Sequence, residues 1–227
     1  MTGIAIIAIP LGFRKTHADA VFFNVRGGCA YFAARDGKTA LICDCNPQDI
    51  RNIVFPFLLA MGKKNVDVLC LPLTSGNLQN IEKLVHNIEY NTLLIPDEFP
   101  DSNMIHVTVR DSIDIQSLKL RFISPKNCKV ELYGRDCLFL HAPMMKLSPC
   151  DIVFINFPAG LLDERLFEDR FAGMEKIESA DVLLLGKDAS AWREKCRSEK
   201  IPYLDINQSA VWIKMTSSSD MEIITAQ

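Results

Sequence analysis

Short apolar runs rich in β-branched and aromatic residues alternate along the chain with turn residues and with stretches of helical periodicity. Residues 20–25 and 29–34 form two such runs, and the Arg-Gly-Gly between them is typical of a hairpin turn. A second turn, Asp-Gly-Lys at 36–38, leads into the apolar run at 39–44. The pattern therefore predicts three consecutive antiparallel strands.

A helix is predicted to follow these strands. Asn46 is a good N-cap, Pro47 suits the first helical position, and Gly62 followed by two lysines signals the end of the helix. Pro56 lies inside this segment and predicts a kink. The continuous apolar run at 66–72 then predicts a strand that is covered on both faces.

The rest of the chain alternates between strands and helices. Helical spacing or helix signals predict helices over 77–88, 163–171 and 188–200, the last with Asp188 as its N-cap. The remaining apolar runs predict strands at 91–96, 104–110, 117–124, 128–133, 136–142, 151–157, 180–186, 202–205, 210–216 and 221–226. This order predicts an α/β (α+β) fold, a four-layer αββα sandwich of two mixed β-sheets.

Composition and charge narrow the function classes. The chain has 227 residues, of which 48% are hydrophobic and 23% charged, and ordinary Gly and Pro contents exclude collagen-like and disordered classes. The formal net charge is −3. Binding of nucleic acid by bulk charge needs clustered Lys and Arg, so the acidic balance argues against it.

Residues 1–18 form an apolar N-terminal segment whose role the sequence leaves open. The run ends at Arg14 and Lys15 and is too short to span a bilayer, which takes about 20 residues. It fits either the stub of a membrane helix or an edge strand. No repeat or linker divides the remainder, so residues 19–227 are predicted to form one domain.

Eight cysteines raise the question of disulfides or zinc. Only Cys43 and Cys45 are close in sequence, and C-x-C is not the C-x-x-C spacing of zinc knuckles and redox motifs. Most of the others lie inside apolar runs. The preferred interpretation is buried free thiols in a reducing compartment, and disulfides in an oxidising compartment are the alternative.

Three collinear segments carry a resemblance to a known family. The segments are "FFNVRGGCAYFAARDGKTALICDCN", "NIVFPFLLAMGKKNVDVLCLPL" and "ADVLLLGKDASAWREKCRSEKIPYLDINQSAVWIKM". Together they resemble the metallo-β-lactamase-like domain at the C-terminal end of ComEC-type DNA-uptake (competence) proteins, from about residue 19 onward. The resemblance implies the metallo-β-lactamase fold and, in metal-binding members, a two-metal hydrolase site.

The metal ligands of that family are missing from this chain. The resemblance places the ligand positions on residues that lack suitable donors: Pro72, Thr74, Gly76, Asn77, Pro143 and Phe157. It also places Asn24, Cys29 and Cys43 where related domains carry aspartate. Independently of the resemblance, the four histidines (His17, His86, His106 and His141) are too scattered to form an H-x-H or H-x-x-x-H pair.

These observations lead to three hypotheses. The first is a catalytically degenerate domain of the ComEC type, with no cofactor and no metal, that serves as a structural or interaction module. Its expected partner is a membrane channel domain, with weak DNA binding at most. The expected location is the extracytoplasmic face of a membrane if the chain belongs to such a protein, and the cytoplasm otherwise.

The second hypothesis is an active metal-dependent nuclease or phosphodiesterase with a rebuilt site. A relict cleft would then gather Cys43, Asp44, Thr74, Asn77 and His141, provided that the strand ends converge. The third is an unrelated protein that binds a small molecule in the empty cleft.

Overall fold

A computed structural model of the chain describes residues 17–72, 88–96, 112–142, 150–156, 180–206 and 210–225. The predicted helix at 163–171, the predicted strand at 104–110 and, apart from Ile88, the predicted helix at 77–88 lie outside the described residues. So do residues 1–16, to which the N-terminal expectations apply.

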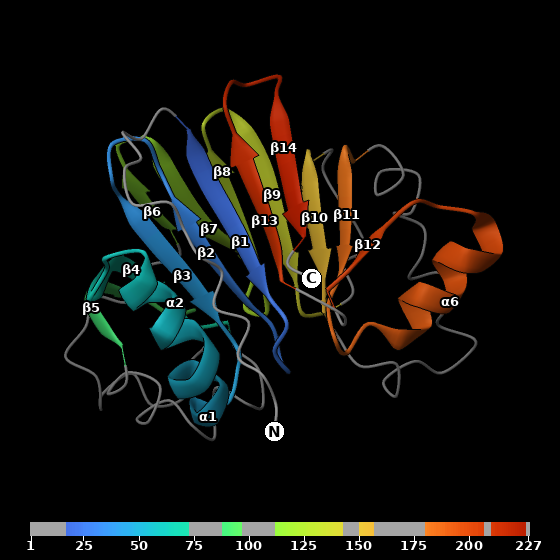
Figure 1. Ribbon diagram of the computed structural model, residues 1–227, viewed down its shortest axis with the longest axis horizontal. Helices are drawn as coiled ribbons and strands as arrows, with labels where there is room; N and C mark the ends of the chain where they lie inside the picture. Colours follow the sequence, from blue (N-terminus) through green and yellow to red (C-terminus); the bar gives the residue numbers. More distant parts are fainter. Residues whose placement is uncertain are drawn as a thin grey trace.

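Two seven-stranded sheets form the body of the molecule (Figure 1). The first sheet has the spatial order β14 (Met221–Thr225), β13 (Val211–Met215), β1 (Ala18–Phe23), β2 (Cys29–Ala33), β3 (Thr39–Cys43), β4 (Asn65–Cys70) and β5 (Glu89–Leu94). The second has the order β12 (Leu204–Asp205), β11 (Val182–Leu185), β10 (Ile152–Ile155), β9 (Arg135–Leu140), β8 (Asn127–Leu132), β7 (Leu118–Ser124) and β6 (Ser112–Ile115).

Both sheets are mixed. Strands β1, β2 and β3 pair antiparallel, as predicted, and β3, β4 and β5 pair parallel. In the second sheet β6 to β9 are antiparallel, whereas β9, β10, β11 and β12 run parallel. Strand β6 lies in a segment for which we predicted no strand; it has only four residues, and none of them is fully buried.

The helical segment after β3 follows the predicted signals closely. Asn46 caps α1 (Pro47–Asp49), because its side-chain oxygen accepts hydrogen bonds from the backbone N–H groups of Gln48 and Asp49, both at 2.9 Å. The kink predicted at Pro56 takes the form of a π-helical turn, η1 (Ile50–Val54), followed by α2 (Phe55–Ala60). A proline crowds the carbonyl one turn earlier, which widens the helix there.

Helix α6 (Ser190–Glu199) corrects one prediction. Asp188 is not its N-cap: Ala189 occupies that position, and the helix has no side-chain cap. The Asp188 carboxylate instead accepts a hydrogen bond from the backbone N–H of Gly27, 2.9 Å away and 161 residues earlier. A long-range contact therefore takes the residue that a local rule assigned to the cap.

Alternation along the strands divides the core into three layers. The inner faces of the sheets pack on each other through residues such as Phe22, Phe32, Phe139 and Phe154. The outer face of the first sheet packs against η1 and α2, and the outer face of the second sheet packs against α6. Figure 1 shows α1 and α2 on one side of the molecule and α6 on the other. The predicted αββα sandwich of two mixed sheets is confirmed.

No helix among the described residues is long and apolar enough to cross a membrane.

Candidate functional site

The strand ends at one edge of the sandwich bring Asp44 and His141 together, as the relict-cleft hypothesis requires. Asp44 follows β3 and His141 follows β9, and alternation points both side chains toward the space between the sheets, on the side of Ile42 and Phe139. His141 Nδ1 lies 3.1 Å from Asp44 Oδ2. Both side chains are buried, with exposed fractions of 2% and 8%.

The backbone next to His141 is fixed by Asn127. Its Oδ1 atom accepts hydrogen bonds from the N–H groups of His141 and Ala142, at 2.9 and 3.0 Å. The imidazole ring packs on Phe139, with ring centroids 4.6 Å apart. Its second nitrogen, Nε2, is buried and makes no hydrogen bond to any described residue. The ring is thus held by its Nδ1 atom and by packing.

A second polar group at the same edge contains Asp188 and Asn156. The Asn156 side chain accepts a hydrogen bond from the Asp188 N–H at 3.0 Å, and its Nδ2 lies 3.4 Å from Asp188 Oδ2. The same carboxylate oxygen accepts the bond from Gly27. Donors of both sheets therefore meet on one carboxylate, which ties the hairpin between β1 and β2 to the segment after β11.

Glycines make this close approach of the two sheets feasible. A Cβ atom on Gly186 would lie 2.4 Å from Asn156 Oδ1, and one on Gly28 would lie 3.1 Å from the Phe154 ring. Side chains at these positions would separate the elements that the polar network joins.

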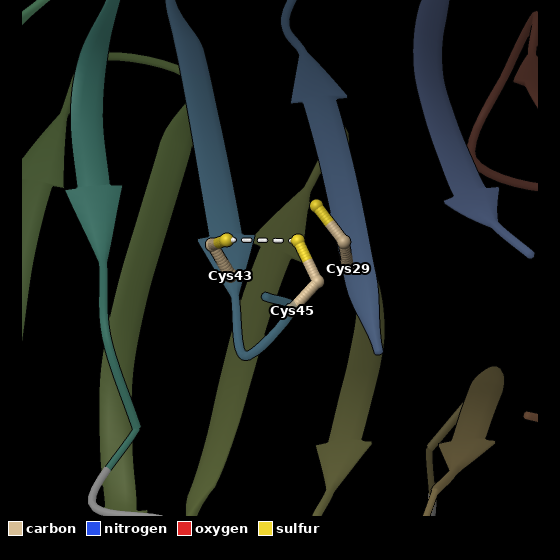
Figure 2. Close-up of side chains that lie close together, drawn as sticks. All are labelled: Cys29, Cys43 and Cys45. Atoms are coloured by element: carbon tan, nitrogen blue, oxygen red, sulfur yellow. Dashed lines mark hydrogen bonds between the residues drawn. The ribbon is translucent and has the colours of Figure 1, made fainter. Parts of the chain in front are cut away.

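The structure does not bring Cys43 into the group of Asp44 and His141. Adjacent strand residues point to opposite faces, so Cys43 belongs to the apolar cluster on the outer face of the first sheet. There it lies beside Cys29 and Cys45, and the Sγ atoms of Cys43 and Cys45 are 3.3 Å apart (Figure 2). None of the eight cysteines forms a disulfide, and all are buried.

The pKa values of these thiols are shifted in different directions. Side-chain hydrogen bonds from Cys29 and from Cys45 hold the pKa of the Cys43 thiol well below its usual value. Burial raises the pKa of the Cys29 thiol. Spacing along the sequence does not reveal this group, because only the pairing of β2 with β3 brings Cys29 to the C-x-C pair.

Of the six ligand positions that the resemblance assigns, the described residues include only Pro72. It lies two residues after the end of β4, and its side chain offers no ligand atom. Thr74, Gly76, Asn77, Pro143 and Phe157 lie outside the described residues, so the predicted convergence of Thr74 and Asn77 on Asp44 and His141 stays a prediction.

The two-metal centre implied by the resemblance does not fit these residues. In the part of the chain that the structure describes, no three His, Cys, Asp or Glu side chains gather at the edge where Asp44 and His141 meet. Asp44 is engaged with His141, and Asp188 with Gly27 and Asn156. Ions about 4 Å apart would need several further charged or imidazole ligands.

Removing the Asp44 carboxylate is expected to destabilise the fold. In Asp44→Ala, a buried ring nitrogen of His141 loses its acceptor, at a cost of about 2 kcal/mol in the free energy of unfolding. Asp44→Asn keeps an oxygen at this position and is expected to cost about 1 kcal/mol. Urea denaturation followed by circular dichroism measures both. Equal losses in the two variants would show that the contact with His141 does not matter.

Comparisons with known proteins give little beyond the fold. No protein-family model matches the chain, and no curated protein does. Several solved structures resemble it. One is MEM-A1, a subclass B3 metallo-β-lactamase isolated from a soil metagenome library, with 14% identity over 79% of this chain and 81% of that chain and a TM-score of 0.43.

Another is a mutant flavo di-iron protein from Thermotoga maritima, with 16% identity over 70% of this chain and 48% of that chain and a TM-score of 0.35. Scores this low carry no argument by themselves. The assignment of architecture rests on the sheets and helices described above: two mixed sheets packed face to face, with helices on both outer sides, are the architecture that the resemblance to a metallo-β-lactamase-like domain implied.

Proposed function

We propose that the chain is a non-hydrolytic domain related to the metallo-β-lactamase-like domain of ComEC-type DNA-uptake proteins, and that it acts as a structural or interaction module. One observation carries the proposal. At the edge where a two-metal site would lie, the carboxylates of Asp44 and Asp188 are held by donors from the protein itself. They act there as connectors between the sheets.

The hydrogen bonds that these carboxylates accept support the same conclusion. A carboxylate that accepts hydrogen bonds in a buried position is satisfied without an ion, whereas a hydrolytic centre needs open metal positions for water. The resemblance in sequence supports the relationship to DNA-uptake proteins, since it runs through three collinear segments.

The proposal is tested by phosphodiesterase activity. The purified chain is incubated with Zn²⁺ or Mn²⁺ and assayed on single-stranded DNA, double-stranded DNA and bis-p-nitrophenyl phosphate. We expect turnover no faster than that of the buffer containing the metal. Turnover that disappears in His141→Ala and persists in the control His17→Ala would instead support the rebuilt hydrolase.

Weak DNA binding is part of the proposal. With a net charge of −3, the chain is expected to bind single-stranded DNA no more tightly than the dissociation constants of about 10⁻⁴–10⁻⁶ M that are typical of non-specific binding. Fluorescence anisotropy at two salt concentrations measures this. Tight binding that falls steeply with salt would make the domain a nucleic-acid module.

A membrane channel is the proposed partner. The expected arrangement is a channel encoded in the same reading frame or by a neighbouring gene, and the genomic context tests it directly. Membrane-spanning segments encoded upstream of Met1 or beside this gene would support the proposal, and a context without a channel gene would contradict it.

A further inference from the structure

Three sulfur atoms meet beneath the helical segment that follows β3. Cys29 lies at the start of β2, Cys43 at the end of β3, and Cys45 just before the cap of α1. Their Sγ atoms all lie within 4.8 Å of one another, and Figure 2 shows the three side chains turned toward a common point. Among the described residues this is the only group of three metal-binding side chains that meet so closely.

The backbone holds the three residues in place. Cys29 and Cys43 are register partners in the antiparallel pair of β2 and β3. The Asp44 N–H donates to the Gly28 carbonyl at 3.0 Å, so the neighbouring pair of cysteines occupies a non-hydrogen-bonded site, where side chains of opposite strands are closest. The Asn46 cap fixes the chain directly after Cys45. The group is therefore built by secondary structure.

The spacing suits a single ion. Three thiolates at about 2.3 Å from one metal ion lie about 3.8 Å from each other in a tetrahedral arrangement and about 4.0 Å in a planar one. The upper limit of 4.8 Å and the Cys43–Cys45 distance of 3.3 Å lie on either side of this value.

The surroundings select the kind of ion. The three cysteines are at most 3% exposed and lie in a cluster of apolar side chains that includes Tyr31 and Leu41. Sulfur ligands favour soft, thiophilic ions, and burial keeps water out of the coordination shell. Hard ions such as Mg²⁺ and Ca²⁺ need oxygen ligands and are disfavoured.

We propose that Cys29, Cys43 and Cys45 form a three-sulfur site for a thiophilic d¹⁰ metal ion, either Cu(I) or Zn(II). The thiols bind as thiolates, so each ligand that forms releases a proton and no change of oxidation state is involved. The site lies on the outer face of the first sheet, opposite the edge network of Asp44. It is independent of the proposed function.

The other buried cysteines provide a contrast. Cys70 and Cys128 face each other between the sheets with their sulfurs 3.6 Å apart, which is a comparable distance. They form a pair, with no third sulfur in the same range among the described residues. Cys128 belongs to this pair and not to the three-sulfur group, so Cys128→Ala removes one buried thiol and serves as the matched control.

The test is a titration of the reduced full chain with Cu(I), in competition with bicinchoninate, and separately with Zn²⁺, in competition with a chromophoric chelator. One equivalent of at least one of these ions is expected to bind. The affinity for the metal should fall by at least about 100-fold in each of Cys29→Ala, Cys43→Ala and Cys45→Ala. This is more than the roughly 10–100-fold loss that is typical when a residue that only hydrogen-bonds to a metal ligand is replaced. Cys128→Ala should bind like the wild type.

Coordination of the wild-type protein is measured as well, because a cysteine variant can fail to fold. X-ray absorption of the loaded chain should show three sulfur neighbours at about 2.3 Å. The absence of binding for both ions, including after refolding with the metal present, would overturn the proposal. So would a shell dominated by nitrogen or oxygen, or equal losses in Cys128→Ala. None of these three results bears on hydrolysis, which His141→Ala tests separately.

Discussion

Gly27→Ala is expected to lower the free energy of unfolding by about 3–5 kcal/mol. Gly27 has φ of +77°, and a Cβ atom there would lie 1.8 Å from the carbonyl oxygen of Asp44. That oxygen is backbone, so the turn itself has to move. The movement also weakens the hydrogen bond from the Gly27 N–H to Asp188, which joins the two sheets. Urea denaturation measures the loss.

Gly62→Ala separates the two causes. Gly62 has φ of +70°, close to that of Gly27, but a Cβ atom there meets nothing within 4 Å. This variant carries the cost of the left-handed backbone alone, about 1 kcal/mol. The difference between the variants reports the steric contact with Asp44. If the two losses were equal, the close approach of the hairpin to the end of β3 would have no energetic weight.

Phe154→Ala is expected to cost about 3–5 kcal/mol. The ring of Phe154 is fully buried between the sheets, with its centroid 5.5 Å from that of Phe22 and 4.5 Å from that of Phe139. It thus joins an aromatic residue of each sheet. Truncation leaves a cavity at the point where the layers meet. A midpoint of thermal unfolding that falls by about 2–4 °C per kcal/mol is the expected readout.

The matched variant is Phe154→Leu. Leucine keeps most of the apolar volume and is expected to cost about 1 kcal/mol. A loss as large as that of Phe154→Ala would mean that the ring contacts, rather than the filled volume, hold the sheets together. A loss below 1 kcal/mol in both variants would contradict the packing described for this layer.

Local patterns predicted most of the described secondary structure, because the relevant forces act over a few residues. The cap at Asn46, the strand before Pro72 and the antiparallel meander from β1 to β3 follow from such patterns. Strand β6 was not predicted, because none of its four residues is fully buried and its pairing with β7 is not a local pattern. Asp188 was assigned wrongly because its partner, the Gly27 N–H, lies 161 residues away.

The part of the candidate site that lies at the strand ends could be predicted from the sequence. Asp44 and His141 were expected to meet if the strands converged, and they lie 3.1 Å apart. The same hypothesis added Cys43, and it failed to apply the two-residue period that sends neighbouring side chains to opposite faces. The three-sulfur group needed a strand register, which spacing along the chain does not contain.

The pairing of β1 with β13 has a consequence for how the protein is made. Ala18 is aligned with Met215, so the second strand that flanks β1 is among the last parts of the domain to leave the ribosome. Until then β1 presents an open, largely apolar edge, and such edges recruit other chains. We therefore expect the nascent chain to be prone to association through that edge until β13 pairs with it, and loss of the hairpin of β13 and β14 would leave the edge exposed.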